Sequence, residues 1–293
     1  FKRFGQVWAR PGALSIRHEL ECAVLDLPYF DMLLEGRRRG EPAARVFERF
    51  VHWGYWADPS CATLDAAEFV AAMERLNAEV LEAAALADGQ HVLDAGCGFG
   101  GTLASLRAAF PHATLTGLNI DPRQLEHARA QVAGVRFIKG DACAPPFPDA
   151  AFDRVLAVEC IFHFPSRAKF LEETARLLKV GGRVALSDFV PRDPNARPGP
   201  LGRWVSAQVA KGYGAGGDDW RDGDYAKMAA AAGLRVVLDR DITANTLPTY
   251  PVLLSLLRAT ASARRMAWPT RLLDWASRLG FVRYRVLAFE KPA

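Results

Sequence analysis

One short glycine-rich stretch constrains the fold of this chain more than any other. Residues 93–101 read LDAGCGFGG and follow an apolar run that predicts a short buried strand. The glycines with the spacing G-x-G-x-x-G are Gly96, Gly98 and Gly101. A helix is expected to begin near Thr102. Because glycine permits a tight turn and a close approach of the backbone to a ligand, this strand–turn–helix unit predicts a bound nucleotide-type cofactor.

After the turn, strand-like and helix-like segments alternate. Further strands are expected at residues 113–120, 135–139, 152–159, 183–190, 234–242 and 281–289. Helices are expected at 64–86, where Leu64 opens the apolar face, at 122–132, at 166–179 with Ser166 as its cap, at 225–232 and over most of 250–279. Such alternation is typical of parallel βαβ units. We therefore expect an α/β fold, a doubly wound, Rossmann-like sheet of mostly parallel strands with helices on both faces.

The segments outside these strands and helices are expected to pack over the sheet. Residues 1–63 are irregular with scattered aromatic side chains, and we expect them to form a helical N-terminal arm or lid. Residues 64–293 would form the cofactor-binding domain. Two insertions are expected within it, a segment rich in Pro and Gly near 191–222 and a later one near 246–278.

Composition excludes several classes of protein. The net charge of +4, from 37 basic and 33 acidic residues, is too mild to predict a nucleic-acid partner. The densest basic stretch, 258–285, holds seven Arg and one acid, and we interpret it as a solvated face, with a peripheral contact to an anionic membrane as the alternative. No apolar run is long enough for stable membrane insertion. Five scattered cysteines without a C-x-x-C pair argue against a metal site and favour a cytoplasmic location. A homodimer is left open.

Two polar side chains at strand ends bear on the kind of cofactor. Asp94 stands where dinucleotide folds usually carry an apolar residue, and a carboxylate there suits a cationic ligand better than a pyrophosphate. Asn119 lies at the end of the second strand, about 20 residues past the glycines, where a ribose ligand is expected. Its amide can hydrogen-bond a hydroxyl without supplying charge.

At this point the chain resembles the class I S-adenosylmethionine-dependent methyltransferases. Residues 92–98 (VLDAGCG) are similar to their first motif, residues 140–153 (GDACAPPFPDAAFD) to the region of their third and fourth strands, and residues 177–183 (LLKVGGR) to the turn before their fifth strand. Asn119 departs from the acid that the family most often carries. Among the relatives that the chain resembles are methyltransferases of natural-product sugars, sterols and quinones.

The resemblance implies a role for each matching position. It places the methionine part and ribose of S-adenosylmethionine along Asp94, Gly96, Cys97 and Gly98. It places Asn119, Ile120 and Gln124 at the ribose and adenine. Asp141 and Ala142 would meet the adenine, and Glu159 would line the methyl-transfer site. S-adenosyl-L-homocysteine would be the product.

Two further stretches carry candidate residues. His163 follows the fourth strand between aromatic residues and is our candidate for the general base, with Asp188 at the end of the fifth strand as its partner, as in relatives that methylate hydroxyls. The aromatic segment 50–56 is read as a lid, with Tyr55 on the cofactor and His52 and Trp53 on the substrate side. Further substrate-binding candidates are Phe162, Phe164, Trp204 and Tyr250, with Tyr213 and Trp220 as weaker ones.

These assignments predict a small-molecule O-methyltransferase. It would transfer a methyl group by SN2 displacement to a hydroxyl of a bulky acceptor of natural-product type. A C- or N-methyltransferase acting on an isoprenoid, quinone or amine is the alternative. Two readings from other classes are an NAD-type oxidoreductase and a non-catalytic protein that binds S-adenosylmethionine. No metal is required by the sequence.

Overall fold

The computed structural model describes residues 27–193, 199–214 and 224–293. Its strands are β1 (His91–Ala95), β2 (Thr114–Asn119), β3 (Arg136–Lys139), β4 (Phe152–Val158), β5 (Leu178–Pro191), β6 (Arg235–Asp241) and β7 (Val282–Glu290). The α-helices are α1 (Pro28–Arg38), α2 (Pro42–Val46), α3 (Ala66–Ala83), α4 (Gly101–Ala109), α5 (Pro122–Gln131), α6 (Arg167–Leu177), α7 (Pro200–Tyr213), α8 (Tyr225–Ala231), α9 (Thr243–Thr246), α10 (Thr249–Ala259) and α11 (Ala267–Arg278). Three short 3₁₀ helices are η1 (Pro59–Cys61), η2 (Ile161–His163) and η3 (Ala261–Met266).

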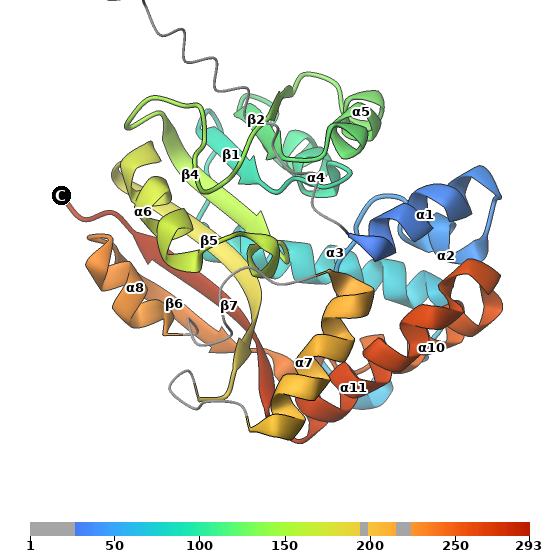
Figure 1. Ribbon diagram of the computed structural model, residues 1–293. Helices are drawn as coiled ribbons and strands as arrows, with labels where there is room; N and C mark the ends of the chain where they lie inside the picture. The colour runs from blue at the N-terminus through green and yellow to red at the C-terminus, as the bar shows by residue number, and fades with distance from the viewer. Residues whose placement is uncertain (1–26, 194–198, 215–223) are drawn as a thin grey trace, which may run out of the picture.

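The seven strands form one sheet in the order β3-β2-β1-β4-β5-β7-β6 (Figure 1). The pairs among β1 to β5 are all parallel, whereas β7 runs antiparallel between β5 and β6. The order reverses beside β1, and open α/β sheets bind ligands at such a switch point. The expected mostly parallel, doubly wound sheet is confirmed.

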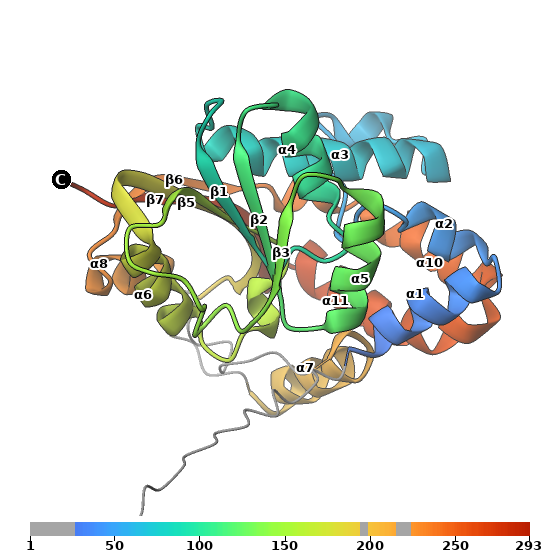
Figure 2. The ribbon, with the colours of Figure 1, turned by 90° about the horizontal axis from the view of Figure 1, so that it is seen from above.

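The sheet is buried on both faces because successive side chains of a strand point in opposite directions. On β1, Val92 belongs to the apolar cluster that includes α3, α4 and α5, whereas Leu93 belongs to the cluster that includes α6 and α8. Figure 2 shows α3 and α4 on one side of the sheet and α6 and α8 on the other.

Side-chain caps begin the helices that flank the site. Ser166 accepts a hydrogen bond from the backbone N–H of Lys169, which confirms the predicted cap of α6. Asp121 caps α5 in the same manner. The helix expected at 64–86 begins two residues too early and ends three residues too late compared with α3. Asp65 is the cap, and Leu64 lies outside the helix, 43% exposed with φ of 61°.

Residues 27–63 do not form a separate layer. The side chains of Phe47, Phe50, Trp53 and Trp56 are buried in the same apolar cluster as α3. The segment expected as an irregular excursion near 191–222 contains the 14-residue helix α7, which packs against α11. Trp220 lies outside the described residues. No helix among the described residues is long and apolar enough to cross a membrane.

Candidate active site

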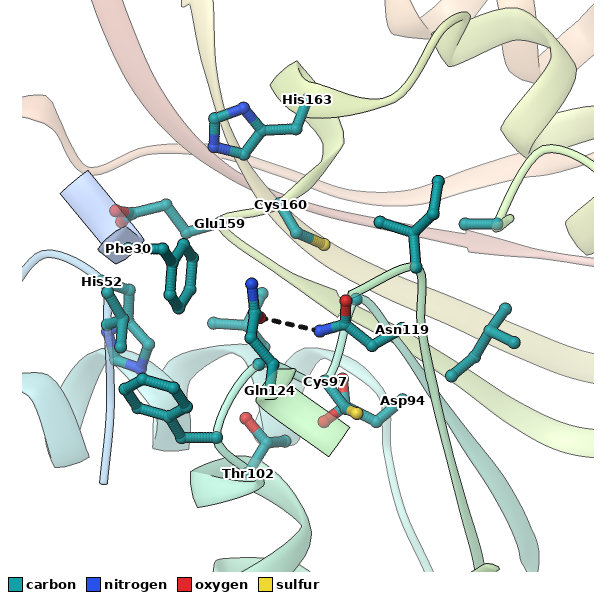
Figure 3. A pocket seen from close by; sticks show the side chains of 18 of the residues that line it. Phe30, His52, Asp94, Cys97, Thr102, Asn119, Gln124, Glu159, Cys160 and His163 are labelled. Carbon is teal, nitrogen blue, oxygen red and sulfur yellow. Dashed lines mark hydrogen bonds between the residues drawn. The ribbon is translucent and has the colours of Figure 1, made fainter. Parts of the chain in front are cut away.

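A cavity of about 900 Å³ lies at the carboxyl ends of β1, β2 and β4, and we call it the cofactor cavity (Figure 3). Its lining includes all but one of the predicted cofactor residues: Asp94, Gly96, Cys97, Gly98, Asn119, Ile120, Gln124, Asp141, Ala142 and Glu159. The exception is Tyr55. The strand ends bring these side chains together because β2, β1 and β4 are adjacent parallel strands.

The glycine turn forms the floor of this cavity. Gly96, Gly98 and Gly100 have positive φ values of 81°, 51° and 85°, a conformation that glycine adopts readily. A Cβ atom on Gly98 would meet nothing within 4 Å, so that position leaves open space beside the backbone. Gly101 instead has a packing role as the first residue of α4, since its Cβ would lie 2.4 Å from the carbonyl oxygen of Arg49.

Asp94 is buried at the end of β1 without a partner for its charge. The side chain is 2% exposed, and Oδ2 has no hydrogen-bond partner among the described residues. Burial raises the pKa of its carboxyl to about 7. A carboxylate kept in such a place is complementary to a cationic group such as the α-ammonium of S-adenosylmethionine, so this residue fits the expected cofactor.

The end of β2 forms a small amide network. Asn119 donates from Nδ2 to Oε1 of Gln124 at 2.9 Å and accepts from the backbone N–H of Asp121 at 3.0 Å. The Gln124 amide nitrogen points into the cavity (Figure 3). Because Asn119 uses both ends of its amide locally, Gln124 presents the group that is free to contact a ribose hydroxyl.

Helix α1 covers the cofactor cavity from the arm. Phe30 packs edge-on against Phe99 of the glycine turn, with ring centroids 5.5 Å apart. Arg123, on α5, bridges Asp31 of α1 and Asp121. The arm therefore supplies a wall of the cavity.

Two further cavities lie near the first and share residues with it or with each other. The inner cavity, of about 510 Å³, is lined by Tyr29, Met32, Leu33, Phe47, Val51, His52, Trp53, Glu159, Phe162, Tyr213, Leu253, Leu257 and Met266. The outer cavity, of about 620 Å³, is lined by Trp53, Phe162, Arg167, Phe189, Ser206, Val209, Ala210, Tyr213, Gly214 and Leu273. The residues that line both the cofactor and the inner cavity are Tyr29, Val51, His52 and Glu159. An acceptor atom that receives a methyl group from the cofactor would meet these four side chains.

The histidines near this boundary are both neutral at neutral pH. His163 is buried, which lowers its pKa to about 3, and its Nε2 lies 3.0 Å from the hydroxyl of Tyr29. Burial also lowers the pKa of His52 to about 4. Nδ1 of His52 donates to the carbonyl oxygen of Trp53 at 2.9 Å, so Nε2, which has no partner among the described residues, carries the lone pair.

Glu159 lines both the cofactor cavity and the inner cavity. It follows β4 with a positive φ of 49°, and its carboxylate accepts hydrogen bonds from the backbone N–H of Trp53 at 2.9 Å and from the hydroxyl of Tyr284. Burial raises the pKa of this carboxyl to about 8, although the two hydrogen bonds oppose the shift. The carboxyl is therefore poised to exchange a proton near neutral pH.

Asp188 does not reach His163. Its Oδ2 accepts from Nε of Arg167 at 2.8 Å and from the hydroxyl of Tyr225 at 2.7 Å. A buried carboxylate next to an arginine pairs with it, since each charge would otherwise lack compensation. Tyr29 occupies the place beside His163 that we expected for Asp188.

The aromatic candidates divide among different surroundings. Trp53 and Phe162 line the inner and outer cavities, whereas Phe164 lines the cofactor cavity. The other three line none of these cavities. Tyr55 packs against the core and donates its backbone N–H to Ala72, Tyr250 is buried with its hydroxyl 2.8 Å from Oγ of Ser277, and Trp204 is 47% exposed on α7.

Several functional residues were missed from the sequence. Tyr29 and Phe30 were overlooked because they lie in a segment without clear periodicity, although Pro28 signals the start of α1. Arg167 follows the predicted cap of α6, where an arginine reads as a solvated residue, yet it is 5% exposed and lines the outer cavity. The described residues contain no cluster of three or more His, Cys, Asp or Glu side chains placed to hold a metal ion.

Comparison with known proteins agrees with this geometry. Residues 93–186 match the model of a methyltransferase domain family. The chain is 35% identical to methyltransferase GfsG of Streptomyces halstedii over 219 residues, 71% of this chain and 74% of that protein. It is 34% identical to the 27-O-demethylrifamycin SV methyltransferase of Amycolatopsis mediterranei, over 68% of this chain and 72% of that protein. Among solved structures, geranyl diphosphate C-methyltransferase of Streptomyces coelicolor superposes with a TM-score of 0.70 at 18% identity, covering 92% of this chain and 99% of that chain.

Proposed function

This chain belongs to the S-adenosylmethionine-dependent methyltransferases, and from that premise we propose that it methylates a hydroxyl group of a bulky, mostly apolar small molecule. The observation that carries the proposal is the boundary between the cofactor cavity and the inner cavity. There, polar groups able to take a proton lie at one end of a space that is otherwise walled by apolar and aromatic side chains.

The residues of the cofactor cavity fit the cofactor. The unpartnered Asp94 carboxylate would hold its ammonium group, the amide of Gln124 a ribose hydroxyl, and Asp141 with Ala142 the adenine edge. When bound, S-adenosylmethionine supplies an electrophilic methyl group on a positively charged sulfur. The chain's part is to align the acceptor and to exclude water, and alignment alone can be worth effective molarities of about 10⁵ M.

The acceptor cavities indicate a large apolar substrate. The inner and outer cavities share Trp53, Phe162 and Tyr213, so they lie next to each other. Most of their lining is apolar or aromatic, as is usual for sites that bind small molecules. Arg167 and Ser206 supply polar contacts at the far end, where they would orient an oxygen-bearing part of the acceptor.

We assign removal of the hydroxyl proton to Tyr29 and His163 from their geometry, although burial lowers the pKa of His163 to about 3 and makes its imidazole a weak base. Tyr29 lines both cavities, and its hydroxyl lies within hydrogen-bond distance of Nε2 of His163. The acceptor's proton would pass to the Tyr29 oxygen while Tyr29 gives its own proton to Nε2. General-base assistance of this kind is typically worth about 10²–10⁴-fold in rate.

The test combines ligand binding with an acceptor screen. Calorimetry should show micromolar binding of S-adenosylmethionine and S-adenosylhomocysteine and none of NADH. Apolar acceptors with a free hydroxyl should gain the mass of one methyl group, and the same compounds with that hydroxyl capped should not. Methylation of capped compounds or of amines would instead favour C- or N-methyl transfer. That alternative remains open.

A further inference from the structure

The solvent-facing side of α11 alternates tryptophan and arginine. Trp268, Arg271, Trp275 and Arg278 follow one another at steps of three and four residues, which places them on one face of the helix. Trp268 is 52% exposed and Trp275 is 45% exposed. The opposite face of the helix is buried against the protein through Pro269, Thr270, Leu273, Ala276 and Ser277. The exposed tryptophans are therefore not the remainder of a core-facing stripe.

Apolar neighbours extend this face. Leu279 and Phe281, which follow α11, are 50% and 57% exposed, and the Phe281 ring lies 5.8 Å from that of Trp275. Helix α7 packs beside α11 (Figure 1) and exposes Leu201 and Trp204. We call these six exposed apolar residues and the arginines among them the α7–α11 face. Exposed large apolar side chains gathered on two packed helices indicate a surface that binds a partner.

The charge of the surrounding segment is strongly positive. Residues 258–279 contain five arginines and one acid, a net charge of +4, which equals that of the whole chain. The single acid, Asp274, accepts from Arg278 at 2.6 Å. Arg264, Arg265 and Arg271 are exposed and make no ion pair within the described parts of the chain. Their charge is available to an anionic partner.

We propose that the α7–α11 face docks the protein on the surface of an anionic membrane. Tryptophan prefers the interface between headgroups and acyl chains, and exposed basic residues are attracted to anionic headgroups. A partner protein would need a shape complementary to this face to contact both the arginines and the apolar side chains. An anionic lipid surface can bind both kinds of side chain over the whole face without such a shape. This inference does not depend on which atom the enzyme methylates.

The position of the outer cavity supports the same partner. Ser206, Val209, Ala210 and Tyr213 of α7 and Leu273 of α11 line that cavity from the inner sides of the helices whose outer sides form the face. An apolar acceptor dissolved in a bilayer would therefore first contact α7 and α11, the two helices that line the outer cavity.

The test is vesicle flotation of the full chain. We expect binding to vesicles of phosphatidylcholine mixed with phosphatidylglycerol, little binding to phosphatidylcholine alone, and loss of binding at high salt. The double variants Trp268→Ser/Trp275→Ser and Arg264→Gln/Arg271→Gln should each weaken binding, the second by about thirtyfold, since each basic residue near such a surface contributes about fivefold. Matched controls are Val180→Ser, another exposed apolar residue, and Arg136→Gln, an exposed arginine on β3.

Each outcome decides the proposal. Calorimetry with S-adenosylhomocysteine should give the same affinity for every variant, which shows that the variants are folded. Equal vesicle binding by the face and control variants, or no binding to the anionic vesicles, would overturn the proposal. So would a dimer in sedimentation that Trp268→Ser/Trp275→Ser dissociates, because the face would then be an interface between two copies of this chain.

Discussion

At the scale of single residues, the site depends on buried polar groups that have no partner within the described protein. Asp94, His52 and His163 each keep one polar atom unpaired, although buried polar atoms are nearly always hydrogen-bonded. All three residues line the cofactor cavity, where a ligand is expected. An unpaired buried polar atom lowers the stability of the fold, so its presence at these residues is consistent with a role in ligand binding.

Replacement of Asp94 by Asn should separate stability from binding. Because the pKa of Asp94 is raised to about 7, its unpaired charge destabilises the fold increasingly as the pH rises from the unfolded value to about 7. Asp94→Asn should therefore raise the melting temperature by a few degrees at mildly alkaline pH. It should weaken S-adenosylmethionine binding by about 10–100-fold, the worth of a charge-assisted hydrogen bond. Differential scanning calorimetry and titration calorimetry measure the two effects.

The same pKa gives the binding a pH dependence. In the wild type, affinity for S-adenosylmethionine should increase as the pH rises through about 7, because only the ionised carboxyl pairs with an ammonium group. Binding below that pH should release a proton, detected by titration in buffers of different ionisation enthalpy. Asp94→Asn should remove both effects, and a pH profile identical to that of the wild type would contradict this role.

Tyr29 and His163 should act as a unit in the reaction. Tyr29→Phe and His163→Gln should each lower kcat by about 10²–10⁴-fold with a hydroxyl acceptor. The double variant should be little worse than either single one, because residues that share one step are not additive. His112→Gln, on an exposed histidine, is the matched control. Near-normal rates in both single variants would assign the proton to another group, with His52 and Glu159 as the remaining candidates at the boundary.

At the scale of elements, the glycine turn and the arm fit closely. A Cβ atom on Gly101 would lie 2.4 Å from the carbonyl oxygen of Arg49 and 2.6 Å from the ring of Phe50. Residues 49–52 form part of the cofactor cavity wall, so a small change in α4 would reach the ligand through the arm.

Gly101→Ala should therefore weaken cofactor binding by displacing Arg49 and Phe50 of the arm. We expect a loss of about 1–3 kcal/mol in the free energy of unfolding from overpacking, and weaker binding of S-adenosylhomocysteine in titration calorimetry. Gly199→Ala, where an added Cβ would meet nothing within 4 Å and φ is −63°, is the control. Unchanged affinity in Gly101→Ala would show that the arm adjusts independently of the ligand.

Local sequence patterns predicted the sheet and the residues that line the cofactor cavity. They did not predict the helices and aromatic side chains that cover the sheet. Strands such as β1 and β4 are short apolar runs next to turn residues, and the residues after them lie at one sheet edge whatever covers it. Tyr55 and Tyr250 were misplaced because the side on which an aromatic residue packs depends on long-range contacts. Helix α7 was missed since Pro and Gly dominate its surroundings, although Pro200 stands at its first position.

At the scale of the whole molecule, the arm and the sheet share one core. Phe50, Trp53 and Trp56 are buried together with Phe69 and Met73 of α3. Residue 63 is therefore not a boundary between independently packed units.

We expect the full chain to unfold in one cooperative transition. A variant comprising residues 64–293 should lose that transition in calorimetry, because removal of the arm exposes the apolar face of α3. Saturation with S-adenosylhomocysteine at about 100 times its Kd should stabilise the full chain by about 2.7 kcal/mol. A shortened chain that melts cooperatively and binds the ligand normally would establish the arm as a dispensable lid.

The place of β7 in the sheet has a consequence for synthesis. β7 is the last of the seven strands along the chain, yet it lies between β5 and β6. The N-terminal parts of a protein emerge from the ribosome first. The backbone groups on one edge of β5 therefore stay unpaired until β7 has been synthesised and pairs with them. The hydroxyl of Tyr284, on β7, also donates to Glu159. The Glu159 carboxylate therefore gains this partner only after β7 has been translated.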